Sequence, residues 1–293
     1  MGGIMKKKKY LFAVVFVLPA FLVYTIFIVA PVFFSICYSF TSWDGIGTPK
    51  MNGIQNYIKM FAMKDYWKVL FNTIKLVGAS VFIQIPIATI LSFLLLRKTK
   101  GYKFFRTFYF IPVVVAPIAI GIMFSLFYNG DVGPINKLLD LIHLSCLKQN
   151  WLSDVNVVVN SVIFPQIWQY IGYSLVIIFA AMKSIDNEML ESADIDGADA
   201  FQIFIHIVVP MCRDAIVVAI ILVVTGSLKS FDYSWALTQG GPGNASSFLA
   251  VFMYKTAFVQ NKFGLGSCVT VTIMIYSIAL SAFIKRFNRD EKE

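Results

Sequence analysis

The side chains that could perform chemistry in this chain are few and widely spaced. Its two histidines, His143 and His206, lie far apart, and its four cysteines show no CxxC spacing, so neither a zinc site nor a disulfide framework is indicated. Intramembrane proteolysis would need a Ser/His pair, two membrane aspartates or an HExxH motif, yet Asp232 is the only carboxylate near an apolar span. The phosphate-binding pattern GxxxxGK(S/T) does not occur. We therefore predict no catalytic residue, metal site or cofactor in this chain, and no enzymatic activity of its own.

The composition is that of a polytopic membrane protein. Hydrophobic residues make up 58% of the sequence and charged residues 14%, whereas soluble domains carry about 25% charged residues. In a soluble protein the net charge of +9 would suggest nucleic acid, but here lysine and arginine cluster beside apolar stretches. The charge is therefore interpreted as a signal of membrane topology, and no nucleic acid partner is expected.

Six apolar stretches are candidates for membrane spans, each of which takes about 20 helical residues. They are predicted at about residues 11–40, 72–96, 105–128, 156–182, 211–236 and 263–285. The first is uncharged far beyond the length of a signal peptide's apolar region and is interpreted as a retained span. The fifth reaches full length only by taking Lys229 and Asp232 into or beside the membrane. We predict an all-α integral membrane protein with one six-span domain over residues 11–287.

Lysine and arginine indicate the orientation of these spans, because cytoplasmic loops carry an excess of them. Fifteen lie on the side that holds both termini, and eight lie on the opposite side. The N-terminus (1–10), the loop 183–210 and the tail (288–293) are thus predicted to be cytoplasmic. On the outer side, the sequence favours an amphipathic helix over 56–74, a short helix within 129–154 and a turn-rich stretch at 238–247.

The loop 183–210 has more pattern than a connection between spans requires. Seven of the sixteen acidic residues of the chain lie in or beside it: Asp186, Glu188, Glu191, Asp194, Asp196, Asp199 and Asp214. The run NEMLESAD favours a short helix that ends in a turn at Asp196 and Gly197. A second run, closed by Pro210, places four apolar side chains on one helical face: Phe201, Phe204, Ile205 and Val208. Two short helices with an apolar face outside the membrane suggest a docking element for a soluble partner.

Polar and aromatic side chains within the spans are costly and therefore suggest function. One group lies in the fourth span and a second around the end of the fifth: Trp168, Gln169 and Tyr173, then Ser227, Ser230, Asp232 and Trp235. Aromatic rings stack on the C–H faces of sugars, while hydroxyl, amide and carboxylate groups bond sugar hydroxyls. These residues are candidates for a sugar pathway. The alternative interpretation is hydrogen bonding between helices, or aromatic belts at the membrane interface.

The patterned loop resembles the EAA loop of permease subunits in binding-protein-dependent ABC importers. That pattern reads EAA, three residues, glycine, nine residues, isoleucine, one residue and LP. It is matched here by Glu191-Ser192-Ala193, Gly197, Ile207 and Val209-Pro210. The departures are Ser192 for alanine, Val209 for leucine and Asp214 where many members have a proline.

The resemblance covers roughly residues 10–287 and favours the carbohydrate-uptake branch. Segments such as FFRTFYFIPVVVAP and FDYSWALTQGGPGN resemble that branch, and the outer-loop motif is similar to the glycerol-phosphate and multiple-sugar permease type. This motif comprises Gly240, Gly241, Pro242, Gly243 and Asn244. The resemblance implies an ABC importer permease fold in a bacterial or archaeal cytoplasmic membrane, with a carbohydrate substrate.

The resemblance also implies the partners. A second, homologous permease would complete the pathway, an extracytoplasmic solute-binding protein would deliver substrate, and two cytoplasmic ATPase subunits would hold ATP and magnesium. The ATPase would be coupled through the positions that match the motif: Glu191, Ser192, Ala193, Asp196, Gly197, Ala198, Ile207 and Pro210. Glu191 would offer a charged anchor, and the Phe201/Phe204 face would hold the loop against its own membrane domain.

Two other classes of function are weighed against this one. A self-contained secondary carrier or channel would need ion-coupling carboxylates within spans, and only Asp232 is available. A membrane enzyme or assembly factor would act without any ATPase partner. The substrate itself is not specified by the sequence, which favours an oligosaccharide or disaccharide slightly over glycerol-phosphate.

Overall fold

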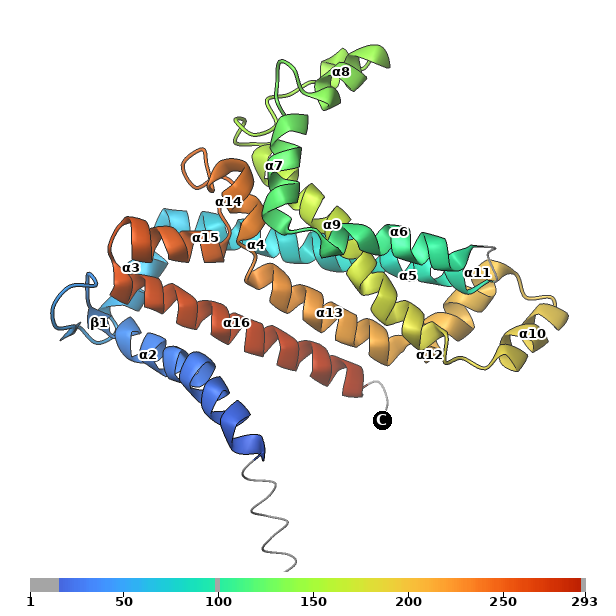
Figure 1. Ribbon diagram of the computed structural model, residues 1–293, viewed down its shortest axis with the longest axis horizontal. Helices are drawn as coiled ribbons and strands as arrows, with labels where there is room; N and C mark the ends of the chain where they lie inside the picture. Colours follow the sequence, from blue (N-terminus) through green and yellow to red (C-terminus); the bar gives the residue numbers. More distant parts are fainter. Residues whose placement is uncertain (1–15, 98–100, 291–293) are drawn as a thin grey trace, which may run out of the picture. The chain divides into compact units, whose positions relative to one another are not determined.

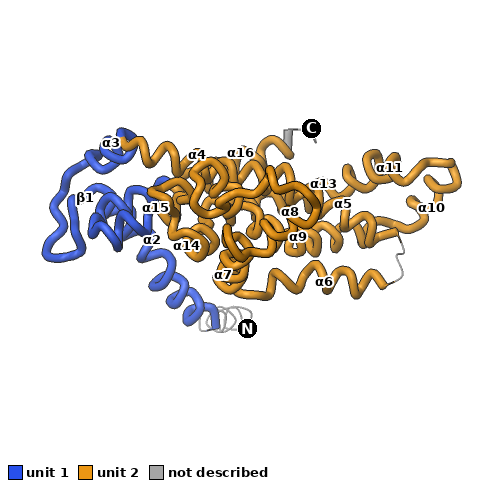
Figure 2. The backbone as a smooth tube through the Cα atoms, turned by 90° about the horizontal axis from the view of Figure 1, so that it is seen from above, with its two compact units in different colours: residues 1–62, 253–272 blue, residues 63–252, 273–293 orange. Residues whose placement is uncertain are grey.

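The computed structural model describes residues 16–97 and 101–290. Its regular structure is helical apart from one antiparallel pair of short strands, β1 (Thr41–Ser42) and β2 (Lys50–Met51). The chain divides into two compact units, which Figure 2 draws in different colours. One contains residues 1–62 and 253–272, and the other contains residues 63–252 and 273–293. The all-α fold class is confirmed, while the single domain over residues 11–287 remains a prediction.

The helical segments follow one another along the chain and are joined by turns and irregular connections (Figure 1). They are η1 (Thr25–Val29), α2 (Ala30–Ser39), α3 (Gln55–Ala62), α4 (Lys64–Ala79), η2 (Ser80–Gln84), α5 (Ile85–Leu96), α6 (Tyr102–Val114), α7 (Pro117–Phe127), α8 (Pro134–Leu141), η3 (Ser145–Leu147), α9 (Val158–Met182), α10 (Asn187–Ile195), α11 (Ala200–Ile203), η4 (Phe204–Val208), α12 (Val209–Met211), α13 (Arg213–Leu228), α14 (Asp232–Thr238), α15 (Leu249–Tyr254), η5 (Lys255–Val259) and α16 (Phe263–Asp290). The segment η3 is a 3-10 turn, and the other η segments are π-helical turns within longer helices.

Four described helices are long and apolar enough to cross a membrane unaided: Phe16–Ser39, Lys64–Leu96, Val158–Met182 and Phe263–Asn288. Two further candidates are bent pairs of helices. The axes of α6 and α7 differ by 92°, and those of the helix Ala200–Met211 and α13 differ by 73°. If each bent pair counts as one span, the described residues hold six, which agrees with the predicted number.

Two spans differ in shape from the sequence prediction. The stretch predicted as a span at 105–128 is broken because a residue before proline avoids the α conformation, and Ala116, which precedes Pro117, is extended with ψ 128°. The stretch predicted at 211–236 is broken as well. There α13 ends at Leu228, the chain turns through Lys229 to Phe231, and α14 begins at Asp232.

The expected outer helix over 56–74 is also divided. The helix α3 ends at Ala62, and α4 begins at Lys64 after the extended residue Met63. From there α4 continues through η2 and α5 as one helix of 33 residues to Leu96. The second half of the expected surface helix therefore belongs to the long helix, whereas a short helix, α8, does lie within 129–154 as predicted.

Two π-turns accommodate prolines inside long helices. Proline lacks an N–H group and crowds the preceding turn, which normally ends an α-helix. Before Pro86, the N–H of Ile85 bonds to the Ser80 carbonyl, five residues back, and Val209 bonds to Phe204 in the same way before Pro210. Such π-turns absorb the irregularity. The helix thus runs through Pro210 to Met211, one residue beyond the closure that the sequence indicated.

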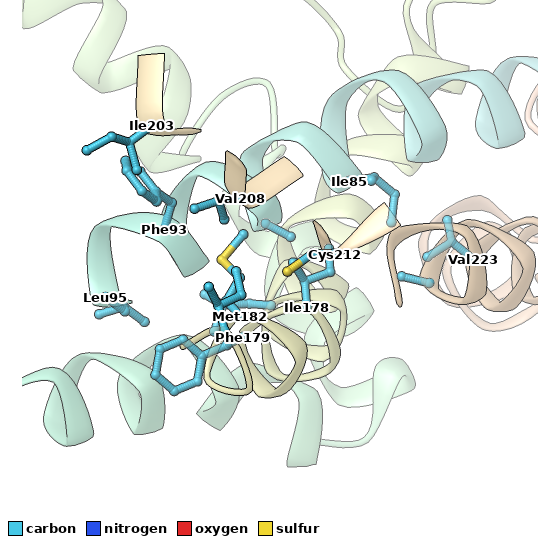
Figure 3. Close-up of a cluster of buried hydrophobic side chains, with 14 residues drawn as sticks. Ile85, Phe93, Leu95, Ile178, Phe179, Met182, Ile203, Val208, Cys212 and Val223 are labelled. Carbon is cyan, nitrogen blue, oxygen red and sulfur yellow. The ribbon is translucent and has the colours of Figure 1, made fainter. Parts of the chain in front are cut away.

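The second unit has two apolar cores along α9. One core joins α5 and the C-terminal half of α9 to the segments from α11 to α13, and Figure 3 shows Phe93 of α5 beside Ile203 of α11. The other core surrounds the opposite half of α9 and includes side chains of α7 and α14. The helices α5 and α9 make the most extensive helix contact of the unit. The helix α9 therefore contributes to both cores and positions the elements that carry the candidate sites.

Candidate functional site

The patterned loop folds into two short helices whose ends are encoded locally. The Asp186 carboxylate accepts the N–H of Glu188 at 3.1 Å and caps α10. After α10, Gly197 adopts a left-handed conformation with φ +80°, and the following Ala198 N–H bonds to the Ala193 carbonyl at 3.0 Å. Asp199 and Gln202 then form a reciprocal capping box that begins α11, with both bonds at 2.8 Å. The helix–turn–helix geometry of this loop is thus as the sequence indicated.

One face of the loop is anchored and the other is open. Four half-buried side chains pack against the apolar core of α5 and α9: Leu190, Ala193, Ala198 and Phe204. Among the residues that match the EAA pattern, Glu191, Ser192, Asp196, Gly197 and Pro210 are exposed, whereas Ala193, Ala198 and Ile207 are half-buried. Ile195 at the tip of α10 is 86% exposed. An outward surface of acidic and apolar side chains is therefore held on a buried base.

The anchoring residues of the second helix differ from the expected set. Phe204 packs on Phe93, with ring centroids 5.0 Å apart, but Phe201 is 70% exposed. Val208 of the expected face is buried, and so is Ile203, which did not belong to that face. These two residues are five apart because the π-turn η4 replaces the α-helical period on which the expected face was based. The expectation that Phe201 holds the loop against the membrane domain was therefore wrong.

Two basic side chains lie beside α10, one at the end of α5 and one at the end of α9, where the loop begins. A guanidinium nitrogen (Nη2) of Arg97, which caps the end of α5, lies 2.5 Å from the Asp194 carboxylate of α10. The Lys183 ammonium lies 5.3 Å from the ring centroid of Tyr102. Arg97 and Lys183 line a cavity of about 450 Å³ together with Glu191 and Asp194. The end of α5 is therefore in direct contact with the loop.

A second cavity, of about 300 Å³, lies between α9, α13 and the start of α14. Its lining comprises Gln84, Gln166, Tyr170, Tyr173, Leu222, Val223, Gly226, Ser227, Lys229, Ser230, Phe231, Asp232 and Tyr233. Amides, hydroxyls and one carboxylate thus share the space with four aromatic rings. That combination can both stack on a sugar ring and hydrogen-bond its hydroxyl groups.

Four of the seven predicted pathway residues line this cavity: Tyr173, Ser227, Ser230 and Asp232. The other three lie outside its lining. Trp168 packs near Phe124, with ring centroids 5.9 Å apart, and Trp235 stacks on Phe231 at 5.4 Å. Gln169 is completely buried and donates to the carbonyls of Pro112 and Val115. For Gln169 the interpretation as an interhelical hydrogen-bonding residue fits the structure better.

Several cavity residues were absent from the predicted set. Gln84 donates its amide to the Tyr170 carbonyl and to the Ser174 hydroxyl, each at 3.0 Å. The Ser230 hydroxyl donates to Gln166 at 2.7 Å. A glutamine within an apolar span is conspicuous in the sequence. The residue type alone does not show whether the side chain faces a cavity or a neighbouring helix. The contacts between helices decide that.

The outer-loop motif Gly240–Asn244 is fastened to α4. The Asn244 amide donates to the Asp65 carboxylate at 3.1 Å. The Asn72 amide donates to the carbonyls of Ala245 and Ser247, at 2.8 and 3.2 Å, and the Thr73 hydroxyl accepts the N–H of Leu249. Pro242 and Gly243 are exposed at the tip. The motif is thus an ordered turn whose base is bonded to a long helix.

Comparison with known proteins gives the class of this chain. Residues 84–292 match the family described as binding-protein-dependent transport system inner membrane component. The chain is 34% identical over 281 residues to the probable ABC transporter permease protein YurN of Bacillus subtilis, covering 95% of this chain and 96% of that one. The chain therefore belongs to this family of inner membrane transport permeases, as the resemblance of its loop predicted.

Other relatives and a solved structure agree with this assignment. The multiple sugar-binding transport system permease protein MsmF of Streptococcus mutans is 28% identical over 262 residues. The match covers 89% of this chain and 89% of that one. A bacterial alginate ABC transporter, solved in complex with an alginate pentasaccharide-bound periplasmic protein, matches with a TM-score of 0.85 at 19% identity. The match covers 99% of this chain and 97% of that one. The predicted importer permease fold is confirmed, in a multi-pass membrane protein.

Proposed function

We propose that this chain is a permease subunit of an ATP-driven sugar importer. Its relatives include permeases named for multiple sugars and for starch degradation products. The cavity beside α9 supplies the aromatic rings and hydrogen-bonding groups that a sugar requires. This chain forms half of a translocation pathway, and a second, homologous permease supplies the other half.

The loop 183–210 couples the permease to a cytoplasmic ATPase. The observation that carries this proposal is the division of the loop into a buried base and an exposed tip that includes Glu191, Ile195 and Gly197. A docking element must be rigidly attached to the moving helices and accessible to its partner, and this loop is both. The chain has no nucleotide-binding pattern, so ATP and magnesium belong to the ATPase, of which two copies dock.

The solute-binding protein approaches from the opposite face. The excess of lysine and arginine on the side of the loop makes that side cytoplasmic, together with both termini. The motif Gly240–Asn244 then faces outward, where a receptor would deliver substrate. The solved alginate transporter of the same fold is in complex with a periplasmic protein, which supports a solute-binding protein as a partner.

Affinity purification of this chain from its native membrane tests the proposal. We expect a second permease, an ATPase and a solute-binding protein to co-purify, and we expect the receptor to bind an oligosaccharide or disaccharide in a ligand screen. Reconstituted into liposomes, the complex should take up that sugar only when ATP is present. Uptake by the purified chain alone would instead identify a self-contained carrier or channel and would overturn the proposal.

A further inference from the structure

The helix α5 connects the substrate cavity with the coupling loop. At its start, Gln84 lines the cavity and is bonded to the Tyr170 carbonyl and the Ser174 hydroxyl of α9. At its end, the backbone N–H of Arg97 caps the helix by bonding to the Phe93 carbonyl at 3.3 Å. An α-helix is stiff over such a length, so its two ends move together. A displacement of the end at Arg97 is therefore transmitted to Gln84.

The end of α5 contacts both short helices of the loop, one on each side of Gly197. Phe93 packs on Phe204 of the second helix, and the Arg97 guanidinium contacts Asp194 of the first. The guanidinium also lies 5.8 Å from the centroid of the Phe93 ring. The ion pair adds a polar attachment to the apolar packing of Leu190 and Ala193, which holds the first helix on the core. Together these contacts fix the orientation of that helix relative to α5.

The two attachments differ in kind. Phe93 is 7% exposed and belongs to the buried core, so its contact contributes to folding. The Arg97 and Asp194 side chains are 37% and 53% exposed. An exposed ion pair changes an equilibrium constant by a factor of only about 1.4 to 5. The ion pair therefore biases the orientation of α10 without being needed for the fold.

We propose that Arg97 is a positioning residue for energy coupling, which acts by fixing α10 to α5 through Asp194. When the ATPase moves α10, the ion pair and the Phe93–Phe204 contact carry both short helices along with α5. The Gln84 side chain at the other end then shifts relative to the cavity. This inference rests on the proposed coupling role of the loop and adds the route by which the loop reaches the substrate.

Variants of the complete, reconstituted importer test this role. Arg97→Gln and Asp194→Asn each remove one charge of the pair, and the readout is the number of sugar molecules taken up per ATP hydrolysed. We expect each variant to lower this ratio roughly two- to fivefold, as suits an exposed ion pair, with unchanged ATPase co-purification. The charge swap, Arg97→Asp with Asp194→Arg, should restore most of the ratio. A merely structural role would instead lower assembly and leave the ratio of the assembled complexes unchanged.

The outer loop offers a matched control. Lys148 and Asp140 also lie 2.5 Å apart with similar exposure, 40% and 44%, but they do not contact the loop 183–210. Lys148→Gln should leave the ratio unchanged. If the complex with Arg97→Gln does not assemble, the role of Arg97 is tested by comparing the uptake ratio of Asp194→Asn with that of the charge swap. An unchanged ratio in the single variants, or a swap no better than either, would overturn the role of Arg97. Failure of the parent importer to couple uptake to ATP would instead overturn the proposed function.

Discussion

The Gln169 side-chain amide donates a hydrogen bond of 2.8 Å to the Val115 carbonyl, at the break between α6 and α7. The same amide nitrogen donates to the Pro112 carbonyl at 2.8 Å. The Pro112 carbonyl also accepts the Val115 N–H at 3.2 Å, whereas the Val115 carbonyl has no helical partner because the chain is extended at Val115 and Ala116. Within a membrane, water cannot satisfy such groups. The Tyr233 hydroxyl donates to the amide oxygen of Gln169 and so fixes the orientation of the amide.

Replacement of Gln169 by leucine should destabilise the protein markedly. The substitution leaves the Val115 carbonyl and the Tyr233 hydroxyl without their partner, and each such group costs about 1–3 kcal/mol. The unfolding midpoint of the purified protein in detergent should fall clearly below that of the parent. Gln260→Leu, at an exposed position, is the control and should have little effect. Equal midpoints for the two variants would show that the bend does not depend on Gln169.

Gly172 permits a close approach of α9 to α6. A Cβ atom at this position would lie 2.0 Å from the Tyr109 carbonyl oxygen, a backbone atom that cannot rotate away. Gly172→Ala should therefore force the two helices apart and cost about 1–3 kcal/mol or more, measured as a lower unfolding midpoint.

A second helical glycine provides the comparison. A Cβ at Gly78 of α4 would meet no atom within 4 Å. Gly78→Ala should be neutral or should stabilise by up to about 1 kcal/mol, because alanine has the higher helix propensity. If Gly172→Ala were equally neutral, α6 and α9 could not be packed as closely as the structure has them.

The loop 183–210 was the most predictable part of the chain because its turns depend on neighbouring residues. Asp186 caps the helix that follows it, Gly197 supplies a left-handed turn, and Asp199 pairs with Gln202 three positions later. Each signal acts within a few residues and needs no tertiary context. The exception was the second helix, where the π-turn before Pro210 replaced Phe201 by Ile203 on the buried face.

The residues that line the cavity beside α9 were less predictable. Trp168, Gln169 and Tyr173 lie within two turns of the same helix, α9, yet only Tyr173 lines the cavity. In a soluble protein the alternation of polar and apolar residues would reveal which face is buried. Within a membrane both the lipid and the protein interior are apolar, so this signal is weak. The rotation of α9 is set by its contacts with α5 and α6, which the sequence does not display.

Gly197→Pro should abolish ATP-dependent sugar uptake while the chain still reaches the membrane. Proline fixes φ near −65°, whereas Gly197 has φ +80°, so the turn between the two short helices cannot form. The measurements are uptake by membrane vesicles and the amount of ATPase that co-purifies. Gly197→Asn is the matched control, because asparagine tolerates the left-handed conformation, and it should retain most of the uptake. Normal uptake by the proline variant would exclude a coupling role for this turn.

Asp232→Asn should weaken substrate recognition more than it weakens assembly. Asp232 is the only carboxylate in the lining of the cavity beside α9, and a hydrogen bond to a charged group contributes about 1.5–3 kcal/mol. Its loss should raise the KM for sugar uptake by roughly 10- to 150-fold. Trp235→Phe, one helical turn away and outside the lining, keeps an aromatic ring beside Phe231 and should leave KM unchanged. If the tryptophan variant raised KM and the asparagine variant did not, the sugar would contact the Trp235 side of α14 rather than the cavity that Asp232 faces.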